Sequence, residues 1–245
     1  MSRLGQIKAF IRTKCPACAL VVGQIRGLHY KTQRLPHKWK SMKSVFSEIY
    51  YNNRWGSQET VSGLASELSQ TSVIRQEIPI LIKEKNARSL LDASCGDFHW
   101  MKEIELDLDR YIGVDIVPDL VVQNQQKYGS ETREFIALDI ARDNLPQVDI
   151  ILCRDCLVHF SFEHIISATR NFRRSKSKYL LTTTFPELSK NEDITTGGWR
   201  PINLQLPPFN FPKPIKLIDE GFTRPDGAAY SDKSLGLWKL EDILL

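Results

Sequence analysis

The fold is decided by Ser89-Leu90-Leu91-Asp92-Ala93-Ser94-Cys95-Gly96-Asp97-Phe98, an apolar run that ends in a turn of small residues. A second apolar run, Tyr111-Ile112-Gly113-Val114-Asp115, ends in a carboxylate nineteen residues after Gly96. This pattern predicts a strand, a turn, a helix and a second strand. Such a turn lets a ligand approach backbone N–H groups, and an acid after the second strand can accept hydrogen bonds from two ribose hydroxyls. A nucleoside ligand is the natural inference.

Short apolar segments and amphipathic segments alternate through the rest of the chain, which is typical of parallel strands joined by helical crossovers. Core strands are predicted at 89–93, 111–115, 134–138, 149–153 and 179–184, each followed by a helix, and two further strands at 215–219 and 235–240. Helices are predicted at 44–51 and 71–85 and after Ser161, which is a good N-cap residue. A length of 245 residues suits one large α/β domain of this kind.

Basic residues are concentrated at the start of the chain. Ten Lys or Arg lie between Arg3 and Lys43 and no acid precedes Glu48, whereas the remainder has 23 basic and 29 acidic residues. Residues 1–43 are therefore predicted to be a basic, solvated segment, with weak contact to an anionic surface as the alternative. Their spacing also resembles an organellar targeting peptide, so a cytoplasmic location is predicted with an organelle as the alternative. No apolar run approaches the ~20 residues of a membrane span.

The five cysteines include two Cys-x-x-Cys pairs, Cys15/Cys18 and Cys153/Cys156. An odd number of cysteines without an obvious secretory signal indicates a reducing compartment. The two pairs are far apart in the sequence, so independent thiols are favoured over a four-thiolate zinc site, and no metal site is predicted.

The strand order and the motif Leu91-Asp92-Ala93-Ser94-Cys95-Gly96 resemble the class I S-adenosylmethionine-dependent methyltransferases. The resemblance implies a doubly wound, mostly parallel seven-stranded sheet with helices on both faces, a Rossmann-like fold with an antiparallel last strand. The resemblance covers roughly residues 55–245, and we expect a methyltransferase domain at 44–245 after the basic segment at 1–43. Within that domain we expect a helical cap at 44–87, a cofactor-binding core at 88–185, and a substrate loop with the final strand pair at 186–245.

The glycine loop departs from the family's commoner three-glycine pattern. Ser94 replaces the first glycine and Phe98 the third, so that Gly96 alone remains. Serine is small enough for a close approach of the ligand to the backbone. We expect Phe98 to begin the following helix and to pack over the ligand.

The resemblance also implies roles for individual residues around S-adenosylmethionine. Asp115 would bind the ribose hydroxyls, Asp139 would accept from the adenine amino group, and the ring would lie between Ile116 and Ile140. A plain turn cap is the alternative for Asp139. Residues near the methionine end would be Asp92, Trp55, Ser62 and Gly63, with a surface connection as the alternative for the last three.

The loop after the fourth strand is predicted to face the same crevice, with Cys153 and Arg154 against the cofactor. Asp155 and His159 are candidates for the base that takes a proton from the methyl acceptor, or for orienting it. The alternatives are that His159 satisfies a backbone group and that Asp155 pairs with Arg154.

Candidate substrate contacts lie in the tail, where Trp199, Arg200 and Asn203 offer an aromatic face and several donors. The alternative is a capping loop that excludes water. The sequence thus predicts an S-adenosylmethionine-dependent methyltransferase acting on an oxygen or nitrogen of a small-molecule or carrier-borne acceptor. An NAD(P)-dependent oxidoreductase, disfavoured by the missing G-x-G-x-x-G spacing, and an inactive nucleoside-binding scaffold are the alternatives.

Overall fold

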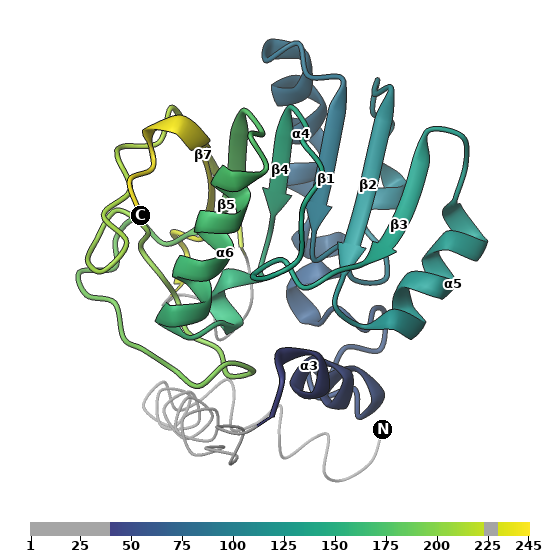
Figure 1. Cartoon of the computed structure of the whole chain (residues 1–245), viewed down its shortest axis with the longest axis horizontal. Helices are drawn as coiled ribbons and strands as arrows, with labels where there is room; N and C mark the ends of the chain where they lie inside the picture. Colours follow the sequence, from purple (N-terminus) through teal and green to yellow (C-terminus); the bar gives the residue numbers. More distant parts are fainter. Residues whose placement is uncertain (1–39, 223–229) are drawn as a thin grey trace, which may run out of the picture. The chain divides into compact units, whose positions relative to one another are not determined.

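The structure, a computed structural model, describes residues 40–222 and 230–245 (Figure 1). Its seven strands form one sheet in the order β3-β2-β1-β4-β5-β7-β6. They are β1 Ser89–Ala93, β2 Arg110–Asp115, β3 Arg133–Ala137, β4 Ile150–Cys153, β5 Tyr179–Thr184, β6 Lys216–Asp219 and β7 Ser234–Lys239. The first five strands are parallel, and β7 is antiparallel to both β5 and β6. The predicted seven-stranded, mostly parallel sheet is therefore confirmed.

Helices cover both faces of this sheet, and an apolar core lies on each face. The α-helices are α3 Met42–Tyr51, α4 Ser72–Glu84, α5 Pro118–Tyr128 and α6 Phe162–Arg174. The buried side chains of α4 belong to one core, and those of α3 and α6 to the other. As predicted, α6 begins after Ser161, whose hydroxyl accepts a hydrogen bond from the backbone N–H of His164 at 3.3 Å. Figure 1 shows α3 lying across the carboxyl ends of the parallel strands.

The prediction that a helix follows every core strand is wrong for three strands, since no helix follows β5 before β6 and two of the crossovers also lack an α-helix. Between β1 and β2 there is only the short 3₁₀ turn Met101–Glu103, and no helix joins β3 to β4. The backbone at Ser94, Gly96 and Phe98 has positive φ angles of 74°, 55° and 58°, which a right-handed helix cannot accommodate. The loop thus keeps a backbone suited to glycine at three alternate positions, although two of them carry side chains.

Two predictions fall on residues outside the described part of the chain. They concern the structure of the basic segment and the thiols Cys15 and Cys18. The division at residue 43 stays a prediction. Among the described residues, no helix is long and apolar enough to cross a membrane.

Candidate functional site

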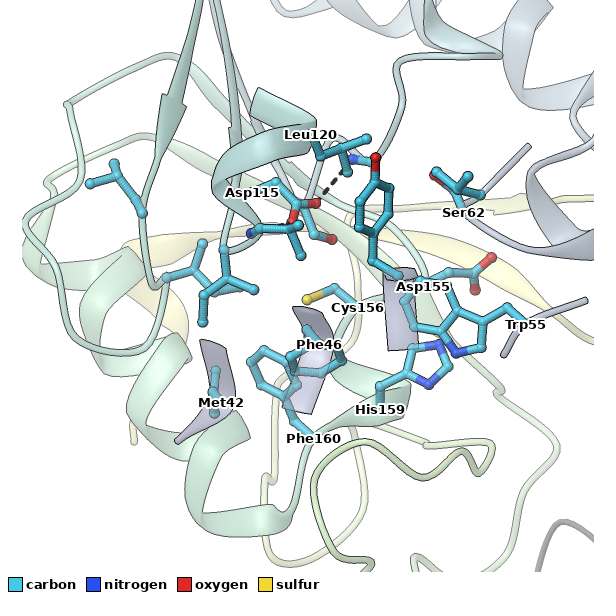
Figure 2. A pocket seen from close by; sticks show the side chains of 18 residues that line it. Met42, Phe46, Trp55, Ser62, Asp115, Leu120, Asp155, Cys156, His159 and Phe160 are labelled. Carbon is cyan, nitrogen blue, oxygen red and sulfur yellow. Dashed lines mark hydrogen bonds between the residues drawn. The ribbon is translucent and has the colours of Figure 1, made fainter. Parts of the chain in front are cut away.

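A pocket opens at the carboxyl edge of the sheet, where the loops after β1, β2 and β4 meet α3 (Figure 2). It encloses about 660 Å³, a volume that includes its open mouth. It is lined by Met42, Phe46, Tyr50, Trp55, Val61, Ser62, Ser94, Gly96, Asp115, Ile116, Val117, Leu120, Leu138, Ile140, Asp155, Cys156, His159 and Phe160. This is the edge at which doubly wound sheets bind their ligands.

Asp115 is held in place by the backbone of two loops. One carboxylate oxygen accepts a hydrogen bond from the N–H of Gly96 at 3.2 Å, and the other accepts from the N–H of Val117 at 3.0 Å. A carboxylate has about four acceptor positions, so two remain for a ligand. Burial raises the pKa of Asp115 above its ordinary value. The arrangement can accept two further hydrogen bonds from the pocket.

The pocket wall beside Asp115 is apolar. Ile116 and Ile140, the two residues expected beside the adenine ring, both lie on it. Asp139 does not line the pocket. Its carboxylate accepts from the N–H of Ala141 at 2.9 Å and so caps a turn, which is the alternative that the sequence left open.

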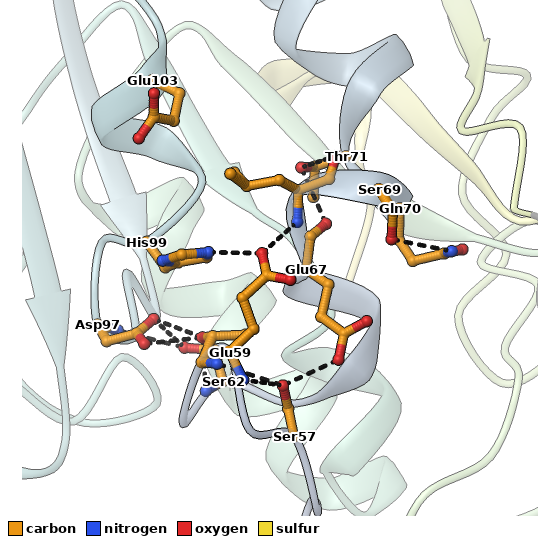
Figure 3. A network of polar contacts seen from close by, with 12 residues as sticks. Ser57, Glu59, Ser62, Glu67, Ser69, Gln70, Thr71, Asp97, His99 and Glu103 are labelled. Atoms are coloured by element: carbon orange, nitrogen blue, oxygen red, sulfur yellow. Dashed lines mark hydrogen bonds and ion pairs between the residues drawn. The ribbon is translucent and has the colours of Figure 1, made fainter. Parts of the chain in front are cut away.

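Asp97 ties the segment before α4 to the glycine loop (Figure 3). Its carboxylate accepts hydrogen bonds from the hydroxyls of Thr60 and Ser62 and from the N–H of Val61, at 2.7 to 3.1 Å. A second link joins the ring of His99 to the carboxylate of Glu59 at 2.8 Å. Through these bonds the loop after β1 fixes the segment that carries Trp55 and Ser62 into the pocket.

Trp55 and Ser62 line the pocket, whereas Gly63 lies just behind them. Gly63 has a φ of 90°, and a Cβ placed there would lie 3.0 Å from the Cβ of Trp55. A residue without a side chain is therefore needed for the observed packing of the indole.

His159 presents one ring nitrogen as a potential proton acceptor. Its Nδ1 lies 2.7 Å from the carbonyl oxygen of Gly198. A carbonyl can only accept, so Nδ1 carries the hydrogen in this contact and Nε2 of the neutral ring keeps its lone pair. The ring packs against the indole of Trp55 with a centroid separation of 5.0 Å. Burial lowers the pKa of His159 below 6.5, so the ring is neutral at pH 7.

Asp155 follows β4 and forms part of a cluster of two acids and two bases. Its carboxylate lies 2.6 Å from the Nζ of Lys233 and 3.4 Å from the guanidinium of Arg154. Both bases also contact the buried Glu220, at 3.1 and 2.6 Å. Burial by itself would raise the pKa of Asp155, but Lys233 and Arg154 outweigh it and bring the pKa to about 2. Asp155 is thus a permanent hydrogen-bond acceptor at the pocket and is not suited to take up a proton near neutral pH.

Neither a family model nor a curated protein matches this sequence. Among solved structures it matches 1,6-didemethyltoxoflavin-N1-methyltransferase from Burkholderia thailandensis, with 17% identity over 84% of this chain and 90% of that chain and a TM-score of 0.55. The chain has the class I methyltransferase fold. Magnesium protoporphyrin IX methyltransferase from Synechocystis PCC 6803 matches less well, with 14% identity over 60% of this chain and 74% of that chain and a TM-score of 0.47. N-methyltransferase NodS from Bradyrhizobium japonicum WM9 also matches less well, with 12% identity over 56% of this chain and 73% of that chain and a TM-score of 0.45.

Besides Gly63 and Asp139, four more residues predicted at the cofactor do not line the pocket of this methyltransferase fold. Phe98, contrary to the prediction, begins no helix and packs in the core on the α4 side, within 5.3 Å of the ring centroid of Tyr111. Asp92 is buried and accepts a hydrogen bond from the Tyr111 hydroxyl at 2.6 Å. Cys153 is fully buried within β4.

The fourth is Arg154, which was predicted to face the crevice. Its guanidinium contacts Glu220 and the carbonyl of Ala65 and lies over the ring of Trp100. Trp100 belongs to the core on the α4 face, whereas the pocket is lined by the core on the α3 and α6 face. Successive side chains of a strand point to opposite faces, and this alternation explains why Asp92 and Arg154 face away from the pocket.

The three predicted substrate contacts in the tail also lie outside the pocket lining. Trp199 packs against Tyr230 with a centroid separation of 4.9 Å. The guanidinium of Arg200 donates to three backbone carbonyls, and the side chain of Asn203 binds the backbone of the same tail. The polar groups of Arg200 and Asn203 organise the loop, and a direct contact of these three residues with an acceptor stays a prediction.

Several pocket features were missed by reasoning from the sequence. Met42 and Phe46 of α3 line the pocket, and Asp97 and Lys233 hold neighbouring segments in place. The apolar face of α3 was a usable signal for the first two. Lys233 lies 78 residues beyond Asp155, and no spacing rule joins such a pair.

Proposed function

We propose that this protein is an S-adenosylmethionine-dependent methyltransferase that acts on an oxygen or nitrogen of a small-molecule or carrier-borne acceptor. The observation that carries the proposal is the single pocket into which the glycine loop, Asp115, the apolar wall at Ile116 and Ile140, and His159 all project.

The donor set fits the chemistry of this cofactor. Its ribose presents two hydroxyl donors, and Asp115 has acceptor positions left after binding the two backbone N–H groups. Its adenine is a flat apolar ring with polar edges, and Ile116 and Ile140 offer an apolar slot beside Asp115. Ser94 and Gly96 would let the backbone of the glycine loop lie close to the sulfonium end of the cofactor, and Trp55 and Ser62 would complete the pocket wall there.

When bound, the cofactor supplies an electrophilic methyl group, and the protein has to orient an acceptor and remove its proton. His159 would take that proton at Nε2, because its other nitrogen is engaged by Gly198 and its ring is neutral at pH 7. Asp155 would accept a hydrogen bond from the methyl-accepting substrate and so orient that substrate, because Lys233 keeps the Asp155 carboxylate charged. The aromatic side chains of Phe46, Trp55 and Phe160 would limit the access of water.

The methyltransferase from Burkholderia thailandensis supports the class of cofactor, since it was crystallised with S-adenosylhomocysteine and 1,6-didemethyltoxoflavin. We propose the same class of methyl donor for this chain and leave the identity of its acceptor to experiment. A cytoplasmic location stays a prediction.

The test is incubation of the protein and a cell extract with methyl-labelled S-adenosylmethionine, followed by mass spectrometry of metabolites and macromolecules. A labelled methyl gain on one species that His159→Gln lowers at least a hundredfold supports the proposal. Tight binding of NAD(P) without binding of S-adenosylmethionine would favour the oxidoreductase. Binding of S-adenosylmethionine with no labelled product from any fraction would favour the inactive scaffold.

A further inference from the structure

A second hollow lies at the opposite edge of the sheet from the pocket. It encloses about 1190 Å³ including its open side. It is lined by Arg170, Arg173, Arg174, Lys176, Ser177, Lys178, Tyr179, Lys239, Leu240 and Glu241, here called the basic groove. Tyr179 is the first residue of β5 and pairs with Lys239, the last residue of β7. The basic groove therefore lies at the amino edge of the parallel strands, away from Asp115 and Asp155 at the carboxyl edge.

The basic groove carries a strong local charge. Six of its lining residues are Lys or Arg and only Glu241 is acidic. Five of the six fall within residues 170–178, and no acid occurs between Glu163 and Glu187. Since acids outnumber bases after residue 43, by 29 to 23, this concentration stands out on an otherwise acidic body.

Most of this charge is not neutralised by neighbouring acids. The side chains of Arg170 and Lys176 form no ion pair or hydrogen bond with the residues that the structure describes, and both are exposed. Two groove lysines are paired with acids. Cations in the last turn of a helix are often explained by the helix dipole, and that accounts for Arg173 and Arg174. It does not extend to Arg170, which precedes the last turn of α6.

We infer that the basic groove binds the sugar-phosphate backbone of a nucleic acid. Arginine and lysine side chains projecting into a concave channel match successive phosphates of a flexible polyanion. The flat surface of a bilayer fits a concave groove poorly. The groove's apolar lining consists of Tyr179, which is half-buried, and Leu240, which is 2% exposed, so no side chain there is free to insert into lipid.

The test compares two charge-reversed variants of the full chain. Arg170→Glu/Arg174→Glu/Lys176→Glu changes the groove, and Lys127→Glu/Lys190→Glu/Lys213→Glu changes the net charge equally at exposed positions outside it. Binding of a fluorescein-labelled, 20-nucleotide single-stranded RNA is followed by anisotropy between 50 and 300 mM NaCl. The basic segment 1–43 is identical in both variants, so its contribution cancels.

The groove variant should lose at least tenfold in affinity at 50 mM NaCl, and the control variant less than threefold. Loss of three phosphate contacts should also reduce the slope of log K against log[salt] by about 2. Arg170→Gln/Arg174→Gln/Lys176→Gln should give an intermediate loss with an unchanged far-UV spectrum, which excludes misfolding. Equal losses in the two charge-reversed variants would overturn the inference. So would loss of binding to phosphatidylserine vesicles with RNA binding retained.

Discussion

Replacing Asp115 by Asn tests the assignment of the ribose. Hydrogen bonds to a charged acceptor contribute about 1.5 to 3 kcal/mol, and those to a neutral one about 0.5 to 1.5. Two ribose hydroxyls would therefore lose about 2 kcal/mol together, which is a factor of roughly 30 in Kd. In addition, the side-chain NH₂ of the Asn would face one of the two backbone N–H donors, that of Gly96 or Val117, which now donate to the Asp115 carboxylate.

The assay is calorimetric titration with S-adenosylhomocysteine and with its 2′-deoxy analogue. Wild-type protein should prefer the hydroxylated ligand about tenfold, and Asp115→Asn should lose most of this preference. Asp115→Glu, which keeps the carboxylate, should lose less affinity than Asp115→Asn. Glu131→Gln removes one charge from an exposed position and serves as the control. A change below threefold for Asp115→Asn, or a preference that survives it, would refute the placement of the ribose.

Three further changes test the rest of the site. The rate of methyl transfer should fall as the pH drops through the pKa of His159, which is below 6.5, because protonation removes the lone pair at Nε2. His159→Gln should lower kcat by a factor of roughly 10² to 10⁴ and abolish this fall in rate at acidic pH. Lys233→Met should destabilise the fold by about 3 to 5 kcal/mol in urea denaturation, because it leaves the buried charges of Asp155 and Glu220 undercompensated. Adding Asp155→Asn should recover part of that loss. If the changes in unfolding free energy of the two single variants simply add in the double variant, the pairing is contradicted. Burial raises the pKa of Asp92 to about 7, so the folded state binds the proton of this carboxyl more tightly than the unfolded state does. The wild type should therefore lose stability as the pH rises from 4 to 7. Asp92→Asn should therefore gain stability over the wild type at pH 8 but not at pH 4, and a pH-independent difference would show that the carboxylate is not buried as described.

The sheet was predictable from the sequence because its strands are short apolar runs bounded by turns. The observed β1 spans the predicted residues 89–93, and the predicted β5 and N-cap Ser161 are also found. Asp115 and Ile116 reach the pocket because they end or follow a strand, and the carboxyl ends of parallel strands meet at one edge.

The rest depended on information that spacing does not carry. Nothing in the local pattern signals that Ser94 and Phe98 adopt left-handed backbone angles, and this conformation replaces the expected helix with a loop. The partner that Arg154 meets on the face opposite the pocket is Glu220, which lies 66 residues away. Tertiary charge pairs of this kind also lower the pKa of Asp155, through Lys233 and Arg154.

The most direct measurement is the electron density of a crystal grown with S-adenosylhomocysteine. We expect the purine between Ile116 and Ile140, both ribose hydroxyls within hydrogen-bond distance of Asp115, and the sulfur facing His159. Density for the ligand elsewhere, or a pocket filled by the side chains of α3 with no ligand bound, would contradict the proposed function.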